Sequence, residues 1–387
     1  MFKWPRARDG FGNALPSVVP AKAGTQYCVS SRGHGVLGPG SPPALASLGR
    51  GRPGRRESWC VLSLAIALGL GPTCGHGRDI DIIMALPAQT LTFSTAFVAE
   101  DAGFYRNEGL KVSHRFLVGV ASPNAVIAGS ADFTIGTGPV FLRAAAQGQR
   151  MLAIANLLDK PLVELVLRKD VAEAARITPA MPLAERAKAL RGKTVAIQGV
   201  GSIVHAWERL VVNRAGLDVE KDVRIAPMDP PAMLPALESK GIDGYATSLP
   251  FTTQAVVQGK AVMLASAASD APDLLPFAYG LLYTKPDTCA QNREKCARIV
   301  RALAAANRFI LEKPGEALGL LRKRFDKMDP AVLATAWQVV SKAHANDIKV
   351  PVVGLDNSQK VSIEAKLLDP KDALKTFDGL YTDEFLR

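Results

Sequence analysis

The stretch that decides the fold class reads KTVAIQGVGSIVHAWERLVVNRA and spans residues 193–215. Its first part has the apolar, β-branched character of a buried strand, and the segment Gly199–Ser202 is rich in turn formers. Apolar residues then recur at helical spacing between Ile203 and Val211. A strand, a short glycine-rich turn and a helix form the repeating unit of parallel sheets covered by helices.

The same alternation extends in both directions from this stretch. On its N-terminal side we expect strands at 80–86, 109–112, 132–136, 151–156 and 163–167, with helices at 96–105, 123–129, 140–147 and 182–190. On its C-terminal side we expect strands at 223–228, 244–247, 261–264 and 277–284, with helices at 232–239, 251–258, 293–312, 314–324 and 331–345. This order predicts an α/β protein of two lobes, residues 79–165 plus 280–387 and residues 168–278. Val163 to Arg168 and Phe277 to Thr284 are expected to act as hinge strands, with a ligand cleft between the lobes.

The N-terminal region differs in composition from the rest of the chain. Residues 1–56 are rich in Gly, Pro, Ser, Ala and Arg without periodicity, which predicts a disordered leader or a translation start placed too far upstream. Residues 57–77 follow a cluster of arginines and contain an apolar run, Trp59–Leu70, and then small residues. This is the layout of a secretory signal peptide, and it predicts a periplasmic protein.

Two details of the signal segment remain open. Cleavage after Gly75 and cleavage after Gly77 both place small residues where a signal peptidase reads them. A lipoprotein anchor on Cys74 is the less favoured alternative, because Pro72 and Thr73 make a poor lipobox. The apolar run itself is too short to span a bilayer comfortably.

The net charge of +11 is concentrated at the N-terminus. Residues 1–78 carry ten Lys or Arg against Asp9 and Glu57, whereas the rest of the chain carries 37 basic and 34 acidic residues. No basic run with interleaved aromatic residues is present, which argues against a nucleic-acid partner.

The cysteines and histidines give no sign of a metal or cofactor. Cys289 and Cys296 follow the expected cleavage site, and they form a disulfide or remain two thiols. Seven residues apart within one helix they would be too distant, so a bridge needs Cys289 in the preceding loop. There is no CxxC motif, and the five histidines lack metal-ligand spacing.

Several blocks of sequence resemble one known family. Residues 97–112 read FVAEDAGFYRNEGLKV, and further blocks read IAGSADF (127–133), LRGKTVA (190–196), ALESKGIDGY (236–245) and GLYTDEFL (379–386). In order and spacing these resemble substrate-binding proteins of ABC importers, in the SsuA-like and NMT1-like group that serves sulfonates, taurine, nitrate and thiamine-precursor pyrimidines. The resemblance covers residues 90–387. It implies a periplasmic binding protein fold with two hinge crossings, of the type II class.

The resemblance also implies a function and partners. A solute-binding protein of this group captures a small molecule between its lobes and delivers it to an ABC permease and its ATPase, as a monomer and without a cofactor. The alternatives are pyrimidine binding or synthesis on the same fold, and a sensory binding module. The fungal synthases with this fold use iron, a cysteine-rich motif and an active-site histidine. This chain has no such cysteine cluster, and no nucleophile, base and orienting group can be assembled from its sequence. We therefore expect a binding protein and not an enzyme.

Candidate ligand-binding residues lie where strands end. The turn before residue 203 supplies Gly199, Gly201 and Ser202, whose amides would face an anion at a helix N-terminus. The remaining candidates follow other strands: Gln89, Thr92 and Ser94; Gly136 and Thr137; Asn156; Ser248 and Phe251. His205 faces the cleft or lies on a solvated face of its helix, and we favour the solvated face. No arginine clamp is identified.

Overall fold

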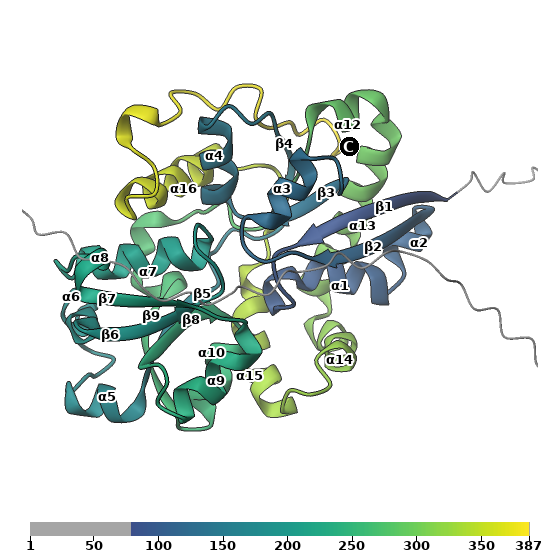
Figure 1. Ribbon diagram of the computed structural model, residues 1–387. Coiled ribbons are helices and arrows are strands. Elements are labelled where there is room, and N and C mark those ends of the chain that lie inside the picture. Colours follow the sequence, from purple (N-terminus) through teal and green to yellow (C-terminus); the bar gives the residue numbers. More distant parts are fainter. Residues whose placement is uncertain (1–78, 387) are drawn as a thin grey trace, which may run out of the picture. The chain divides into compact units, whose positions relative to one another are not determined.

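The computed structural model describes residues 79–386, which belong to one compact unit (Figure 1). The expected leader at 1–56 and the signal peptide at 57–77 lie outside the described residues. Within 79–386, no helix combines the length and apolar character that crossing a bilayer requires.

The first sheet has five strands in the order β2-β1-β3-β10-β4. Their bounds are Ile80–Leu86 (β1), Leu110–Phe116 (β2), Phe133–Gly136 (β3), Leu152–Asn156 (β4) and Leu281–Thr284 (β10). Strand β1 is parallel to β2 and β3, whereas β10 is antiparallel to β3 and β4. Four helices connect these strands: α1 (Ser94–Asp101), α2 (Phe104–Asn107), α3 (Ala121–Ile127) and α4 (Gly138–Ala146). The single helix expected at 96–105 is interrupted by Gly103, which has a φ of 81°.

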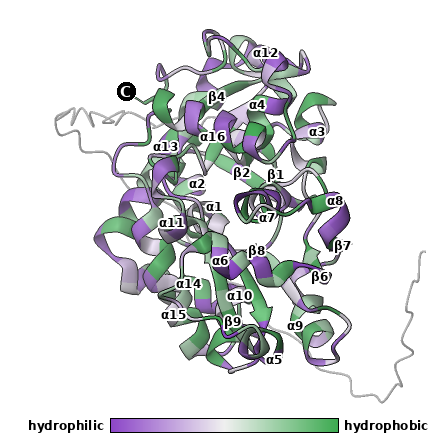
Figure 2. Cartoon of the chain, turned by 90° about the vertical axis from the view of Figure 1, so that its left-hand side faces the viewer, coloured by the Kyte–Doolittle hydropathy of each residue, from purple (hydrophilic) through white to green (hydrophobic). Residues whose placement is uncertain are grey.

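The second sheet repeats this pattern in the order β7-β6-β8-β5-β9. Its strands are Val163–Arg168 (β5), Lys193–Ile197 (β6), Val223–Pro227 (β7), Gly244–Ser248 (β8) and Ala261–Ser266 (β9). Its helices are α5 (Lys169–Ala174), α6 (Leu183–Ala187), α7 (Ile203–Arg214), α8 (Val219–Asp222), α9 (Pro230–Glu238), α10 (Phe251–Val257) and α11 (Ala267–Asp270). Figure 2 shows hydrophobic stretches in strands of both sheets. The interior strands β3 and β8 are buried along their whole length, whereas the edge strands β2 and β7 are largely exposed or half-buried.

The expected hinge Val163–Arg168 is the interior strand β5, and residues 281–284 of the expected hinge Phe277–Thr284 form the interior strand β10. Strand β5 forms ladders with β8 and β9 on its two edges, and β10 does the same with β3 and β4. A strand that is hydrogen-bonded on both edges cannot act as a hinge without breaking its sheet. The chain crosses between the sheets in the segments 157–162 and 267–280, next to these strands, so residues 277–280 of the second expected hinge do lie in a crossing.

The C-terminal part is helical. It contains α12 (Pro286–Gln291), α13 (Arg293–Glu312), α14 (Pro314–Arg324), α15 (Pro330–Val340) and α16 (Val352–Glu364). Sequence reasoning missed α16, whose buried face holds small and polar residues such as Gly354 and Ser362 in place of an apolar stripe. Helix α16 packs against both α4 and α7, so it contacts helices that belong to different sheets.

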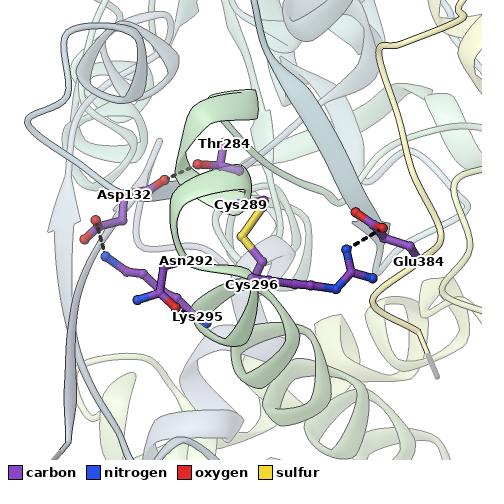
Figure 3. Close-up of a disulfide and its surroundings, with 8 residues drawn as sticks. Asp132, Thr284, Cys289, Asn292, Lys295, Cys296 and Glu384 are labelled. Carbon is purple, nitrogen blue, oxygen red and sulfur yellow. Dashed lines mark hydrogen bonds and ion pairs between the residues drawn. A yellow bond between two sulfur atoms is a disulfide. The ribbon is translucent and has the colours of Figure 1, made fainter.

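Cys289 and Cys296 form a disulfide (Figure 3). Their Cα atoms are 5.5 Å apart, because the helix is broken at Asn292 and the two cysteines belong to different helices, α12 and α13. The Asn292 side chain accepts a hydrogen bond from the Lys295 amide at 2.9 Å and so begins α13. Cys289 lies in this short preceding helix, where a loop was expected.

Candidate functional site

A small cavity lies where loops from the two sheets meet. About 40 Å³ of it is open to the centres of water molecules. Its walls come from the segments that follow β1, β2, β3, β6 and β8, together with two tyrosines near β10. The lining residues are Pro87, Thr90, Thr92, Phe93, Gly119, Pro123, Gly136, Thr137, Val140, Gln198, Ser202, Ile203, Val204, Ser248, Tyr279 and Tyr283. None of these carries a charge, and the site lies at the carboxyl ends of parallel strands, where α/β proteins bind ligands.

Unpartnered hydroxyl groups are concentrated in this cavity. Five buried lining residues have a side-chain oxygen without a hydrogen-bond partner among residues 79–386: Thr90, Thr92, Thr137, Tyr279 and Tyr283. Buried polar groups are nearly always hydrogen-bonded, because an unpartnered one loses its hydration without compensation. A cluster of such hydroxyls around a cavity is therefore suited to a bound molecule that completes their hydrogen bonds.

The two tyrosines are fitted closely into the first sheet. A Cβ atom added to Gly136 would lie 2.5 Å from the Tyr283 hydroxyl oxygen, so only glycine leaves room for this group at the cavity. Burial raises the pKa of Tyr279 above its ordinary value, and the neighbouring side chains of Ser248 and Thr92 partly oppose that rise. Tyr279 thus lies where polar side chains from both sheets meet.

The turn before α7 forms the opposite wall. Ser202 caps the helix, because its Oγ accepts a hydrogen bond from the His205 amide at 3.2 Å and donates one to the Gly199 carbonyl at 2.7 Å. Gly201 has a φ of 77°, which favours glycine. Its amide donates to Nδ1 of His205 at 3.0 Å, and the Ser202 amide donates to the Gly199 carbonyl at 3.3 Å.

The amides expected to face the ligand are consequently used inside the turn. The next two amides, of Ile203 and Val204, belong to the first turn of α7, where helical geometry provides no acceptor. Both residues line the cavity. The helix N-terminus therefore offers donors and a positive dipole end to the cavity one residue later than the sequence predicted.

An outer groove adjoins the cavity. Its volume is about 710 Å³, and it shares Pro87 and Gln198 with the cavity. Its other lining residues are apolar, charged or neutral amides: Ala88, Gln89, Phe116, Val118, Asp229, Pro230, Pro231, Phe251, Gln254, Arg324, Phe325, Asp326, Lys327 and Met328. The cavity and groove together form a polar inner chamber with a larger, partly apolar entrance.

Comparison with known proteins assigns the family. The family model described as NMT1/THI5 like matches residues 91–317. The chain belongs to the NMT1/THI5-like family. No curated protein sequence matches it.

Solved structures similar to this NMT1/THI5-like chain share its fold. A protein of Bordetella bronchiseptica RB50 has a TM-score of 0.67 at 22% identity, covering 79% of this chain and 96% of its own. The alkanesulfonate-binding protein SsuA from Xanthomonas axonopodis pv. citri, bound to MOPS, has a TM-score of 0.60 at 16% identity and coverages of 77% and 97%. The periplasmic nitrate-binding protein NrtA from Synechocystis PCC 6803 has a TM-score of 0.60 at 14% identity and coverages of 80% and 88%.

These similarities confirm the predicted family resemblance and the two-lobed periplasmic binding protein fold. The Xanthomonas SsuA is itself an alkanesulfonate-binding protein and the Synechocystis NrtA a nitrate-binding protein.

The structure brings together some of the predicted site residues and separates others. Thr92, Gly136, Thr137, Ser202 and Ser248 line the cavity, and Gln89 and Phe251 line the outer groove. Ser94, Asn156, Gly199 and Gly201 line neither. Four polar residues of the cavity lining were missed, namely Thr90, Gln198, Tyr279 and Tyr283. Their signal in the sequence was only a polar residue at or next to a strand end.

Ser94 and His205 serve the framework of the site. The Ser94 hydroxyl lies 3.0 Å from Nε2 of buried His344, whose Nδ1 lies 2.7 Å from Oδ1 of Asn307. His205 was expected on a solvated face, but it is only 6% exposed because it turns inward to receive the Gly201 amide. Burial, with the charges of Arg209 and Arg143, lowers the pKa of His205 to about 4, so the ring is neutral at pH 7.

Arg143 connects the two sides of the site without lining the cavity. It lies on α4 and donates hydrogen bonds to the Gly201 carbonyl and, at 3.3 Å, to the Ser362 hydroxyl on α16. Burial lowers the pKa of Arg143 to about 10, which leaves it charged at pH 7. This residue, which nothing in the sequence singled out, holds the α7 turn against α4.

Proposed function

We propose that the chain is an exported solute-binding protein of an ABC importer. It captures a small organic solute with an anionic or strongly accepting group, such as a sulfonate or carboxylate, and delivers it to a permease and its ATPase. The observation that carries this proposal is the uncharged cavity, enclosed by loops of both sheets and surrounded by unpartnered hydroxyls.

The chemistry of the cavity supports an accepting ligand group. Hydroxyls of threonine and tyrosine can donate hydrogen bonds, and the main-chain N–H groups of Ile203 and Val204 are donors only. Hydrogen bonds from neutral donors to a charged acceptor are stronger than those between neutral groups, so an anion gains most from this arrangement. The small volume admits a compact head group, and the outer groove has room for the rest of the molecule.

The second candidate is a neutral thiamine-precursor pyrimidine, bound or made on the same fold. Its supporting observation is that no cation lines the cavity. Synthesis is disfavoured because Cys289 and Cys296 are joined in a disulfide and neither His205 nor His344 lines the cavity. Binding of such a pyrimidine remains the alternative that an experiment has to separate from anion binding.

A thermal-shift panel separates these ligand classes. The panel contains methanesulfonate, MOPS, benzoate, acetate, nitrate and 4-amino-5-hydroxymethyl-2-methylpyrimidine, and calorimetry follows for every compound that raises the Tm. We expect sulfonates or carboxylates to stabilise the protein, because a ligand that binds only the folded state raises its unfolding free energy. Tight binding of the pyrimidine alone would replace the anion proposal, and no response to any compound would contradict it.

The closure of the lobes is part of the proposal. Ligand contacts from both sides of the cavity favour the closed form, since only that form makes all of them. We expect small-angle scattering to show a smaller radius of gyration when a compound from the panel saturates the protein. An unchanged radius at saturation would contradict movement about the crossings at 157–162 and 267–280.

Export is tested on the mature protein. N-terminal sequencing of the protein from the periplasm should give a first residue shortly after Gly75 or Gly77, because residues 57–77 have the signal-peptide layout. A first residue before about position 70 would contradict the signal peptide.

A further inference from the structure

Gln198 holds a distinctive place between the cavity and the outer groove. It follows β6 directly, and with Pro87 it is one of two residues that line both spaces. It is also the only side-chain amide in the cavity lining. A solute with its head in the cavity and its body in the groove passes beside this amide.

The orientation of the Gln198 amide is set by a neighbouring strand. The Thr247 hydroxyl donates a hydrogen bond to Oε1 of Gln198 at 2.9 Å. Thr247 lies on β8, is fully buried, and lines neither space. Because Oε1 receives this proton, Nε2 of Gln198 is left to donate its two N–H groups to another partner.

Thr247 is itself held by the second sheet. It is the ladder partner of Glu164 on β5, and the Glu164 carboxylate accepts a hydrogen bond from the Thr252 hydroxyl at 2.5 Å. The Thr247 hydroxyl donates to Gln198 and not to this carboxylate. A buried hydroxyl fixes an amide more firmly than a solvated one, because no water competes for the bond.

The structure assigns Gln198 as the residue that selects the solute at the junction of the cavity and groove. Its Nε2 donates a hydrogen bond to an acceptor atom of the solute, and Thr247 is the residue that positions it. This assignment rests on the proposed function, because it takes the cavity to be the binding site. The solute class it favours carries its acceptor oxygens where the head group joins the body. A solute with a donor there, such as an exocyclic amine, is disfavoured by the same Nε2.

Two pairs of variants test the assignment, with methanesulfonate and acetate as anionic probes and 4-amino-5-hydroxymethyl-2-methylpyrimidine as the amine probe. Gln198→Glu keeps an acceptor for Thr247 but replaces the donor with a carboxylate oxygen. We expect it to weaken anion binding by about 30-fold or more and to weaken amine binding less than about threefold. Gln258→Glu places the same charge at an exposed position that lines neither the cavity nor the groove, and it should change anion binding less than about threefold.

The second pair isolates the positioning role of Thr247. Thr247→Val keeps the shape of the side chain but removes its hydroxyl, and we expect about 10-fold weaker anion binding. Thr247→Ser restores the hydroxyl and should bind within about twofold of the wild type. If Thr247 had a purely structural role, anion binding by both variants would weaken in proportion to their loss in Tm. The Tm of each variant is measured in parallel without any probe.

The outcomes separate this assignment from the proposed function. Suppose that the wild type binds anions. If Gln198→Glu and Gln258→Glu are then equally affected, or if Thr247→Val is unaffected, the assignment is overturned and the proposed function is left in place. Binding of none of the probes by the wild type overturns both. If Gln198→Glu does not fold, the comparison of Thr247→Val with Thr247→Ser decides alone.

Discussion

The two walls of the cavity present polar groups of different kinds. The hydroxyl wall belongs to the first sheet and consists of Thr90, Thr92, Thr137, Tyr279 and Tyr283. The helix wall belongs to the second sheet and consists of Gln198, Ser202, Ile203, Val204 and Ser248. A hydroxyl rotates and can donate or accept, whereas a main-chain amide donates in one fixed direction. The helix wall should therefore determine the charge of the ligand, and the hydroxyl wall should determine how tightly a ligand of that charge is held.

Each wall is supported by one buried histidine. His344 contacts Ser94 and Thr95 at the start of α1, directly after the segment that carries Thr90 and Thr92. His205 receives the Gly201 amide behind the helix wall. Burial lowers the pKa of His344 to about 3 and that of His205 to about 4, so both rings are neutral at pH 7. The walls differ in the groups they present but share this sensitivity to acid.

The largest effect is expected from Ser202→Asp, which adds a negative charge to the helix wall. Aspartate is as good an N-cap as serine and can still accept from the His205 amide, although the hydrogen bond that Ser202 donates to the Gly199 carbonyl is lost as the negative charge enters the wall. We expect anion binding to weaken by at least about 100-fold, since the new charge repels the ligand and neutralises the positive end of the helix dipole. Calorimetry with the best anion of the panel measures the change.

The control for this variant is Ser239→Asp, which adds the same charge at the exposed end of α9, away from both the cavity and the groove. Its affinity should match that of the wild type. Equal binding by Ser202→Asp and wild type would show that the helix wall does not select for charge.

Sequence reasoning located most of the strands and the helix wall, for a physical reason. Apolar strands followed by glycine-rich turns occur only in a few arrangements, and the carboxyl ends of parallel strands must share one edge of the sheet. Gly136, Thr137 and Ser202 could be placed there from their position after a strand. Even so, the direction of each amide in the α7 turn depended on His205, whose inward orientation has no local signature.

The hydroxyl wall was harder to predict because long-range packing builds it. Tyr279 and Tyr283 lie in or beside a strand that reads simply as apolar and buried, and only its antiparallel place next to β3 brings Tyr283 against Gly136. Arg143 shows the same limit. Its partners, Gly201 and Ser362, are distant in the sequence, and α16 carries no apolar periodicity that would reveal its packing.

An effect of intermediate size is expected from acid, which should lower the free energy of unfolding through the buried histidines behind both walls. The folded pKa of His344, about 3, lies below its ordinary value of 6.5, so its contribution to stability is complete above pH 6.5 and is lost as the pH falls toward 3. At pH 5 we expect the loss from His344 to be about 2 kcal/mol of unfolding free energy. Urea unfolding of wild type and His344→Gln at pH 7 and pH 5 measures it.

The difference between the two proteins is the informative quantity, because another buried group titrates in the opposite sense. Burial raises the pKa of Glu208 on α7 to about 8, so its contribution grows as the pH falls from 8 toward 4.5. This slope is common to wild type and His344→Gln and cancels. Equal losses in both proteins between pH 7 and pH 5 would show that His344 is not the acid-sensitive support of the hydroxyl wall.

The smallest effect is expected from a single change in the hydroxyl wall, Thr137→Val. The Thr137 hydroxyl is buried without a partner within residues 79–386, so its replacement by a methyl group should leave the Tm of the free protein unchanged or higher. Binding should weaken by about 5- to 10-fold, which corresponds to the loss of one hydrogen bond.

Thr252→Val is the matched control, because the Thr252 hydroxyl is also buried but donates to Glu164. That variant should lower the Tm and leave affinity nearly unchanged, since Thr252 lies outside the cavity and groove linings. A Tm loss in Thr137→Val like that of Thr252→Val, with unchanged affinity, would mean that the hydroxyl wall stabilises the fold and does not hold the ligand.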